Sequence, residues 1–279
     1  MTLKAAKVIS RKANIDLPGE IEIREPYWYV LKGARNGGLS ACKKYGPLAY
    51  RNPQKRQRNW QSWWDEKGKF LRNSVIRPKP ITEPRESSDL AEFMGIFLGD
   101  GGLSERQLVI TLCSDEKPYV KFVRNLMKKL FGVNPSVYQS KHERVIDVVI
   151  SRTALVRFFQ EKLKIRPGSK IRQKIDVPGW IKDNEKYRAP CLKGLFDTDG
   201  SIFIHKYKSK GKVYAYKRLG FTNRSLPLLE SAKEMLDSLG VNNRLAGRYD
   251  IRIEAKKDID EFFSLVGTHN PKHLIIYRK

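Results

Sequence analysis

Two segments about 108 residues apart carry apolar residues at helical spacing and predict amphipathic helices. Each begins at a proline, Pro118 or Pro227, and each ends at the tripeptide Gly-Val-Asn, residues 132–134 or 240–242. A proline at the start and a glycine at the end are typical of helix boundaries. The apolar positions are Tyr119, Phe122, Val123, Leu126, Met127, Leu130 and Phe131 in the first segment, and Leu228, Leu229, Ala232, Met235, Leu236 and Leu239 in the second.

The segments around these two helices also repeat, and in the same order. Residues 107–112 and 144–151 predict strands in the first copy, and residues 219–222 and 249–254 predict strands in the second. A phenylalanine pair follows in a further predicted helix, at 158–159 and again at 262–263. The succession helix, two strands, helix, two strands, helix therefore occurs twice, which indicates an internal duplication and an α+β fold.

Each copy opens with an apolar run that closes in Asp-Gly. The runs are Phe93-Met94-Gly95-Ile96-Phe97-Leu98-Gly99-Asp100-Gly101 and Leu192-Lys193-Gly194-Leu195-Phe196-Asp197-Thr198-Asp199-Gly200. Small residues four apart, Gly95 with Gly99 and Gly194 with Thr198, share one helix face and allow two helix backbones to approach closely. We expect Gly101 and Gly200 to end these helices at positive φ, and Asp89 with Glu92 to form a capping pair at the start of the first.

Two such helices packed side by side would bring Asp100 and Asp199 together at the negative ends of two helix dipoles. That arrangement is unfavourable unless a cation is present. The ligands are hard oxygens with no Cys or His close by in sequence, which favours Mg²⁺ (or Mn²⁺) over Zn²⁺. A single Asp-Gly can be merely a helix stop followed by a turn, but the second copy argues against that interpretation.

Both runs resemble the signature of the LAGLIDADG homing endonuclease family, in its single-chain, two-motif form. The second copy, read from Leu192, keeps six of the nine signature letters, and the first keeps Gly95, Asp100 and Gly101. The resemblance covers roughly residues 88–279. It implies two pseudo-symmetric αββαββα repeats whose antiparallel sheets form a saddle on double-stranded DNA, with the motif helices between the halves. It also implies a monomer that acts on a long, near-asymmetric target site.

The resemblance further assigns candidate catalytic residues. The motif acids map to Asp100 and Asp199, which would hold divalent cations at the scissile phosphates. Asp197 also matches a signature letter, where the first copy has Leu98, but the catalytic carboxylate is the later one. Lys170 and Lys272 fit the basic residue that the family places near each metal, and Gln107 is a candidate for positioning water. The alternative for either lysine is a solvated or phosphate-facing charge.

Strand geometry would place Lys206, Lys208, Lys210 and Lys212 on one face of a long predicted hairpin, as DNA contact requires. The alternative is a frayed, solvated loop tip. The remaining residues expected to contact DNA are Arg106, Lys141, Arg144, Lys217, Arg218, Arg248 and Arg252.

The net charge of +25 points to a polyanionic partner, and nucleic acid is favoured because the chain has no hydrophobic anchor. Residues 32–79 hold 13 Lys or Arg and 2 acidic residues, interleaved with aromatic residues. They are expected to form an accessory DNA-binding segment, a basic helical hairpin whose tryptophans pack on the next domain, or both. Ile21, Ile23, Tyr27, Trp28 and Tyr29 suggest a short strand or hairpin before this stretch. The predicted organisation is a basic N-terminal region at 1–80, an extended linker at 81–88, a first repeat at 89–185 and a second at 186–279.

The three cysteines lack a C-x-x-C pair, which argues against a disulfide framework or a zinc site and for a reducing compartment. Residues 1–14 lack the apolar core of a signal peptide, and no apolar run reaches membrane-spanning length. We therefore expect a cytoplasmic or organellar-matrix protein that is neither secreted nor membrane-bound. His269-Asn270 with His273 is not expected to form an HNH or zinc site, because no further Cys or His ligands accompany it.

The functional hypothesis is a site-specific, metal-dependent endonuclease that cuts double-stranded DNA. The alternative is a nucleic-acid-binding protein on the same scaffold without cleavage, either an intron RNA maturase or a DNA-binding regulator. Retention of both aspartates favours the enzyme, although a maturase that keeps both activities, with intron RNA as a further partner, is compatible with it. A ribosome-like structural RNA-binding protein would explain the charge but not the duplicated Asp-Gly helix ends.

Overall fold

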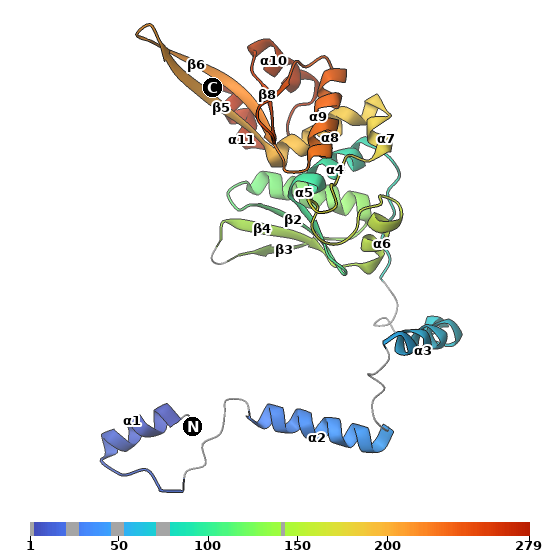
Figure 1. Cartoon of the computed structure of the whole chain (residues 1–279), viewed down its shortest axis with the longest axis vertical. Helices are drawn as coiled ribbons and strands as arrows, with labels where there is room; N and C mark the ends of the chain where they lie inside the picture. The colour runs from blue at the N-terminus through green and yellow to red at the C-terminus, as the bar shows by residue number, and fades with distance from the viewer. Residues whose placement is uncertain (1–2, 21–27, 46–52, 71–78, 141–142) are drawn as a thin grey trace. The chain divides into compact units, whose positions relative to one another are not determined.

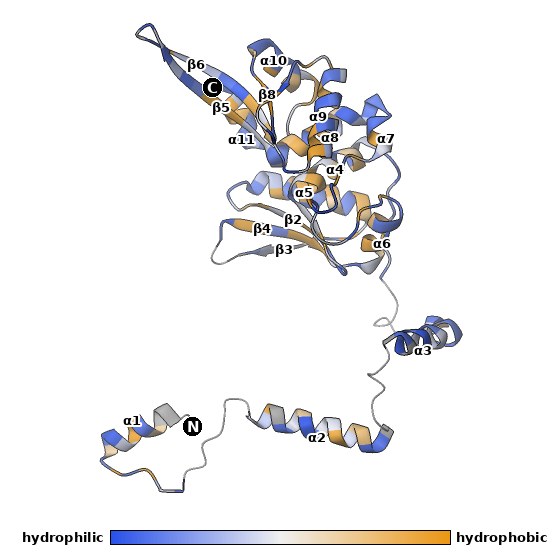
Figure 2. Ribbon diagram, viewed as in Figure 1, coloured by the Kyte–Doolittle hydropathy of each residue, from blue (hydrophilic) through white to orange (hydrophobic). Residues whose placement is uncertain are grey.

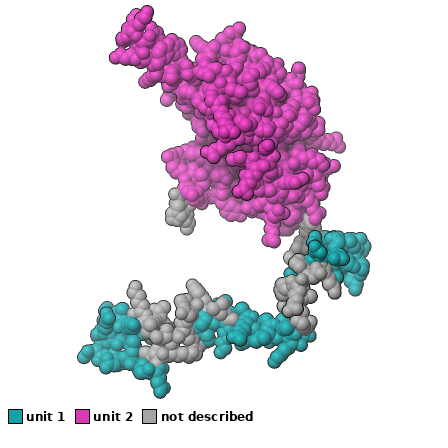
Figure 3. Space-filling model, viewed as in Figure 1, with its two compact units in different colours: residues 1–72 teal, residues 73–279 magenta. Residues whose placement is uncertain are grey.

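The computed structural model describes residues 3–20, 28–45, 53–70, 79–140 and 143–279. The chain divides into two compact units, residues 1–72 and residues 73–279 (Figure 3). Each unit is described below by itself. Among the described residues, no helix is both long enough and apolar enough to cross a membrane.

The first unit is helical where it is described. It contains α1 (Leu3–Ala13), α2 (Trp28–Tyr45), α3 (Pro53–Glu66) and the short 3₁₀ helix η1 (Gly68–Phe70). The strand expected around residues 21–29 is wrong at Trp28 and Tyr29, which begin α2, and Ile21, Ile23 and Tyr27 lie outside the described residues. Helix α3 is largely hydrophilic (Figure 2). On it the rings of Trp60 and Trp64 stack with their centroids 5.7 Å apart.

The second unit contains two repeats of the same element order (Figure 1). The first repeat is α4 (Ser88–Asp100), β1 (Gly101–Leu103), β2 (Leu108–Cys113), α5 (Lys117–Phe131), β3 (Ser136–Gln139), β4 (Val145–Ile150) and α6 (Thr153–Glu161). After the short α7 (Gly179–Lys182), the second is α8 (Glu185–Asp199), β5 (Gly200–Ser209), β6 (Lys212–Thr222), α9 (Leu226–Ser238), β7 (Arg244–Leu245), β8 (Asp250–Ile253) and α10 (Lys256–Leu265). A last helix, α11 (Pro271–Arg278), follows. The predicted α+β class and duplicated order are confirmed.

Each repeat folds around one four-stranded antiparallel sheet. The strand orders are β1-β2-β4-β3, called sheet A, and β5-β6-β8-β7, called sheet B, so the two sheets have the same topology. In sheet A the alternating residues Leu108, Ile110 and Leu112 are buried on the helix side and leave Thr111 exposed. This alternation is typical of a sheet with one packed and one open face.

The ends of the motif helix α4 differ from the expectation in detail. The helix is capped by Ser87, whose hydroxyl accepts from the Leu90 backbone N–H, so the predicted Asp89–Glu92 capping pair is wrong. Gly101 and Gly200 have φ of −83° and −85°, so the predicted positive φ is also wrong. Glycine is required there for close packing instead: a Cβ at Gly101 would lie 2.4 Å from Cδ2 of Phe97, and one at Gly200 would lie 2.1 Å from Cδ2 of Phe196.

The extended segment before α4 is attached to the first repeat. The Thr82 N–H donates to the Phe131 carbonyl over 2.9 Å, and Ile81 packs against the core. This contact fixes the end of α5, where Gly132 takes a left-handed conformation with φ of 66°.

The hairpin β5–β6 is much longer than its counterpart β1–β2. It pairs ten residues, from Gly200 opposite Phe221 to Ser209 opposite Lys212, whereas β1–β2 pairs three. Because β8 pairs only with Leu219–Thr222, the outer part of β5–β6 is a two-stranded ribbon that projects from the body (Figure 1). Its turn is Lys210-Gly211, both at positive φ, the pattern of a tight hairpin turn.

Candidate metal site and nucleic-acid surface

The site is built on the contact between α4 and α8, which meet through their glycines. A Cβ on Gly95 would lie 2.1 Å from the Cys191 carbonyl oxygen, and one on Gly194 would lie 2.1 Å from the Glu92 carbonyl oxygen. The two contacts are related by the repeat, and each leaves no room for even a methyl group. The predicted small-residue interface between the motif helices is confirmed.

This close packing carries through to the helix ends, where Asp100 and Asp199 meet. A Cβ on Gly99 would lie 3.3 Å from the carboxylate carbon of Asp199. Burial, and then the charge of Asp199, raises the pKa of Asp100 from 3.8 to about 6. Burial also raises the pKa of Asp199, against the amide of Asn223 and the charge of Lys170. Two carboxylates that repel each other in a partly dehydrated site fit a hard divalent cation.

Lys170 lies beside both aspartates, the position that the family resemblance implies for it. Its ammonium group donates to the carbonyls of Phe97 (2.9 Å), Leu98 (2.8 Å) and Gly99, the last turn of α4. Burial lowers the pKa of Lys170 to about 8, although Asp199 and Asp100 both favour its charged form. The lysine therefore places a positive charge at the negative end of the α4 dipole and next to the acidic pair.

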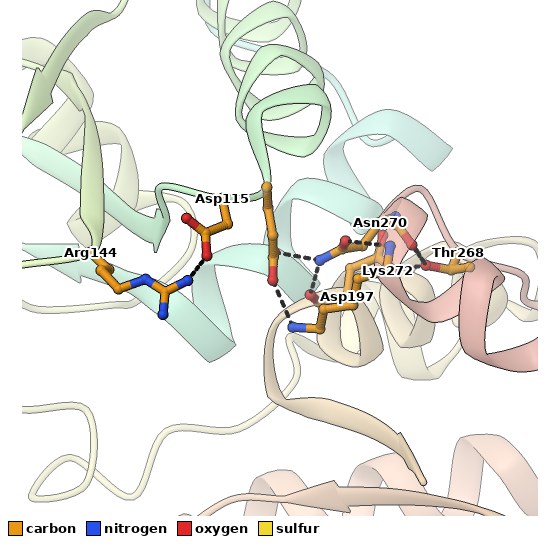
Figure 4. A network of polar contacts seen from close by, with 7 residues as sticks. Asp115, Arg144, Asp197, Thr268, Asn270 and Lys272 are labelled. Atoms are coloured by element: carbon orange, nitrogen blue, oxygen red, sulfur yellow. Dashed lines mark hydrogen bonds and ion pairs between the residues drawn. The ribbon is translucent and has the colours of Figure 1, made fainter.

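Lys272 reaches the same region from the second repeat, but it is paired with Glu116 of the first. The distance between its Nζ and Glu116 Oε1 is 2.8 Å, and its charge lowers the pKa of Asp100. The buried Asn270 donates to Glu116 Oε2 over 2.6 Å and also contacts the Asp197 carbonyl (Figure 4). Glu116, Asn270 and Lys272 thus connect the two repeats beside the aspartates.

Asn223 is a site residue that the sequence reasoning missed. Its amide donates to Asp199 Oδ2 over 2.7 Å, and its own side-chain oxygen accepts from the Ser225 N–H, which fixes its orientation. The available signal was an Asn two residues before a Ser that precedes a helix, a pattern that forms turns. Among the described residues no such amide donates to Asp100, so the two aspartates are held differently.

Asp197 lies in a polar group with Glu92 and His269, in which the two carboxylates are buried and the histidine is exposed. Their ligand atoms all lie within 4.8 Å of one another. The carboxylate of Asp197 accepts from the Thr268 hydroxyl and the His269 N–H, and Glu92 contacts the His269 ring. Burial raises the pKa of Asp197 to about 6. Because these atoms bond one another, the group attaches the C-terminal segment to both motif helices. His273 is buried against Phe196, and burial lowers its pKa to about 4.

Gln107 lies at the turn end of β1–β2, whereas Asp100 precedes the other end of β1. Its side-chain oxygen accepts from the Ser151 hydroxyl over 3.3 Å. The structure therefore does not bring Gln107 together with the two aspartates, and its water-positioning role stays a prediction.

The open face of sheet B holds only some of the predicted DNA-contacting residues. Arg218 and Arg252 lie on this face with Arg244, which the sequence reasoning missed. The expectation that four lysines share one face of the hairpin is wrong, because Lys206 and Lys208 lie on the other face, Lys210 is in the turn, and Lys212 pairs with Ser209 on the open face. Lys217 also faces away, where its Nζ donates to the Tyr277 carbonyl over 2.6 Å.

The remaining predicted DNA-contacting residues lie around the sheets. Arg106 is exposed in the β1–β2 turn, Arg144 pairs with Asp115 at the end of sheet A (Figure 4), and Arg248 lies over the ring of Tyr249. Lys141 lies outside the described residues.

Comparison with known proteins decides the family. The profile described as the LAGLIDADG-like domain matches residues 87–164 and again residues 186–267. The chain belongs to the LAGLIDADG-like domain family. The two matched segments coincide closely with the two repeats, and both Asp-Gly runs, residues 93–101 and 192–200, fall inside them.

Similarity to individual proteins is lower. The chain is 27% identical over 175 residues to an uncharacterised protein of Methanocaldococcus jannaschii, and 29% identical over 175 residues to the replication factor C small subunit of the same organism. Each match covers 58% of this chain, and they span 62% and 9% of the two relatives. Solved structures that resemble it include the homing endonuclease I-DmoI, with 21% identity over 64% of this chain and 95% of that one and a TM-score of 0.44. Another is the N-terminal LAGLIDADG domain of DUF199/WhiA, with 20% identity over 66% and 84% and a TM-score of 0.43.

Proposed function

We propose that this LAGLIDADG-family protein is a site-specific endonuclease that cuts double-stranded DNA with a divalent cation, Mg²⁺ or Mn²⁺. The observation that carries the proposal is the meeting of Asp100 and Asp199 at the ends of the paired motif helices, both half-buried and both with raised pKa. A protein that only binds nucleic acid gains nothing from two carboxylates held where a phosphate must approach.

The position of each residue at the site suggests a separate role for it. Asp100 and Asp199 would hold the cations, which when bound supply an activated water and stabilise charge on the phosphate. The Asn223 amide fixes one oxygen of Asp199 and leaves the other free to bind metal. Lys170, anchored on three carbonyls of α4, places its charge beside both carboxylates, where it favours an incoming phosphate.

The test is cleavage of a randomised duplex library with and without Mg²⁺, with the Asp100→Asn, Asp199→Asn double variant for comparison. We expect metal-dependent cutting at one long sequence by the wild type and none by the variant. The matched control is Asp89→Asn, which removes an exposed carboxylate paired with Lys129 and should leave cutting unchanged. Equal cutting by the double variant would refute the proposal.

The second candidate is sequence-specific nucleic-acid binding without cleavage, as in a regulator or a maturase. The arginines on the open face of sheet B favour it as strongly as they favour the nuclease, because DNA binding needs no metal site. Tight, salt-sensitive binding of duplex by a wild type that never cuts would select a regulator. A marked preference for structured intron RNA would select a maturase.

A further inference from the structure

The two sheets can be compared position by position, because one cross-strand pair occurs in both. Thr111 lies opposite Asp147 in sheet A, and Thr222 lies opposite Asp250 in sheet B. In each pair the threonine hydroxyl donates to the carboxylate, over 2.6 Å in sheet A. These pairs fix the equivalence of the two open faces without any assumption about sequence similarity.

Two residues along the strands from this pair, the side chains differ sharply. Sheet A has Val109 opposite Val149, and sheet B has Gly220 opposite Arg252. A Cβ at Gly220 would lie 2.7 Å from Arg252 Nη1, so the glycine makes room for the arginine to lie across the sheet. The guanidinium lies 5.0 Å from the centre of the Phe203 ring and donates to Asp250 over 2.9 Å.

Two residues further along, the contrast recurs. In sheet A the Ser151 hydroxyl donates to Gln107, and in sheet B Arg218 pairs with Glu254 at 2.9 Å. Arg244 makes two bonds to the same carboxylate, at 2.7 and 3.0 Å. Sheet B thus presents three arginines that are each oriented by a carboxylate on the open face.

Sheet A presents the opposite chemistry. The strand residues of its open face are Gly102, Val109, Thr111, Cys113, Ser136, Tyr138, Val145, Asp147 and Val149, and this set contains no Lys or Arg. Its one charge, Asp147, is bonded to Thr111. Val149 is buried, so the groups that this face offers a ligand include the methyl groups of the partly exposed Val109 and Val145, the exposed Tyr138 and the Gln107 amide.

In the major groove of DNA, the side chains of the two sheets would contact different bases. An oriented arginine bonds O6 and N7 of guanine, an apolar side chain contacts the thymine methyl, and glutamine pairs with adenine. We propose that the two repeats read their half-sites differently, with sheet B reading guanines through Arg218, Arg244 and Arg252, and sheet A reading an A·T-rich half-site through thymine methyls and Gln107. This rests on the proposed binding of duplex DNA across both sheets, but not on cleavage.

The test uses modified bases in a duplex selected by binding in EDTA, where cutting is absent. Deoxyuridine removes the thymine methyl, and 7-deazaguanine removes the guanine N7 acceptor. To identify which half-site sheet B contacts, Tyr207 on the β5–β6 ribbon is replaced by the photo-crosslinker p-benzoylphenylalanine. The crosslinked nucleotides mark the half-site bound by sheet B. We expect 7-deazaguanine to weaken binding about 10-fold or more in that half only, and deoxyuridine to weaken it several-fold in the other half only.

Two variants test the named residues. Arg252→Lys keeps the charge but loses the two-pronged bond, so the guanine preference should relax about 10-fold while the salt dependence stays the same. Val109→Thr, nearly isosteric, should reduce sensitivity to deoxyuridine. Lys206→Met, on the opposite face of the ribbon, is the control and should alter neither preference.

The outcomes separate the two proposals. If both half-sites are equally sensitive to each modified base, or if the pattern is reversed, the assignment of guanine recognition to sheet B and A·T recognition to sheet A is wrong. The protein would still be a DNA-binding protein. If each modified base weakens binding in the expected half-site only, but the protein does not cut DNA, the assignment of the two sheets is supported and the proposed nuclease activity is refuted. Absence of sequence-specific duplex binding overturns both.

Discussion

Replacement of Gly95 by alanine tests how tightly the motif helices must pack. The added Cβ would lie 2.1 Å from the Cys191 carbonyl oxygen, whereas ordinary contact begins at 3.4 Å, so α4 and α8 must separate by about 1.3 Å at that point. A gap of 0.5–1 Å already forfeits a quarter to a half of each dispersion contact along an interface, and overpacking typically costs about 1–3 kcal/mol. Because the obstacle is backbone on both helices, we expect a loss of about 3 kcal/mol in the free energy of unfolding.

Thermal unfolding of the full chain measures this loss. For a unit of 207 residues, residues 73–279, a cost of about 3 kcal/mol lowers Tm by roughly 6–12 °C. The control is Gly102→Ala, where a Cβ meets nothing within 4 Å, and Tm should change little. Alanine is normally favoured over glycine inside a helix by about 1 kcal/mol, so an unchanged or raised Tm for Gly95→Ala would refute the close packing of the helices.

Three further predictions concern charge and metal. The pKa of Asp100 is raised from 3.8 to about 6 in the folded protein, so without metal its stabilising contribution is present below pH 4 and is lost as pH rises through 6. Relative to the wild type, Asp100→Asn should therefore gain up to about 3 kcal/mol more in the free energy of unfolding at pH 7.5 than at pH 4. Denaturant unfolding of both proteins at the two pH values measures this difference, and an equal effect of the substitution at both would contradict the raised pKa of Asp100. Millimolar Mg²⁺ should raise the Tm of the wild type at pH 7.5 but not of the Asp100→Asn, Asp199→Asn variant; an equal rise in both would place the ion elsewhere. Lys170→Met removes charged hydrogen bonds to the last carbonyls of α4 and should lower the free energy of unfolding, measured with denaturant, by about 2 kcal/mol. The control Lys129→Met, on the exposed side of α5, should change it little. Similar losses in both variants would contradict the anchoring of Lys170 on α4.

Binding to duplex DNA should weaken steeply with salt. If four phosphates are neutralised, affinity falls about 100-fold between 50 and 200 mM monovalent salt. Fluorescence anisotropy at four salt concentrations gives the slope, and a flat response would contradict the use of the basic surfaces.

The sequence predicted the repeat and the aspartate pair because both depend on local signals. Proline and glycine mark the helix boundaries, and the spacing of Gly95, Gly99 and Gly194 follows directly from helix geometry. Lys170 was found only through the family resemblance, since nothing local distinguishes it among 55 basic residues.

The predictions that are wrong or missing depend on strand register or on contacts between residues distant in the sequence. The turn at Lys210-Gly211 shifts Lys212 to the other face from Lys206, which alternation counted through the turn does not reveal. Gly101 was assigned a left-handed conformation because glycine often ends helices, but its role depends on the ring of Phe97 lying against it. Asn223 was missed because its partner, Asp199, is reached only after β5 and β6 pair.

The most direct test of the metal-dependent nuclease is strand-resolved cleavage of the selected duplex on a denaturing gel in Mg²⁺, with wild type, Asp100→Asn and Asp199→Asn. If the two aspartates hold the cations, the wild type cuts both strands, and each single variant loses double-strand cleavage while it still binds the duplex. Double-strand cleavage by either variant at the wild-type rate, or cleavage by the wild type in EDTA, would contradict the assignment of Asp100 and Asp199 as the metal site.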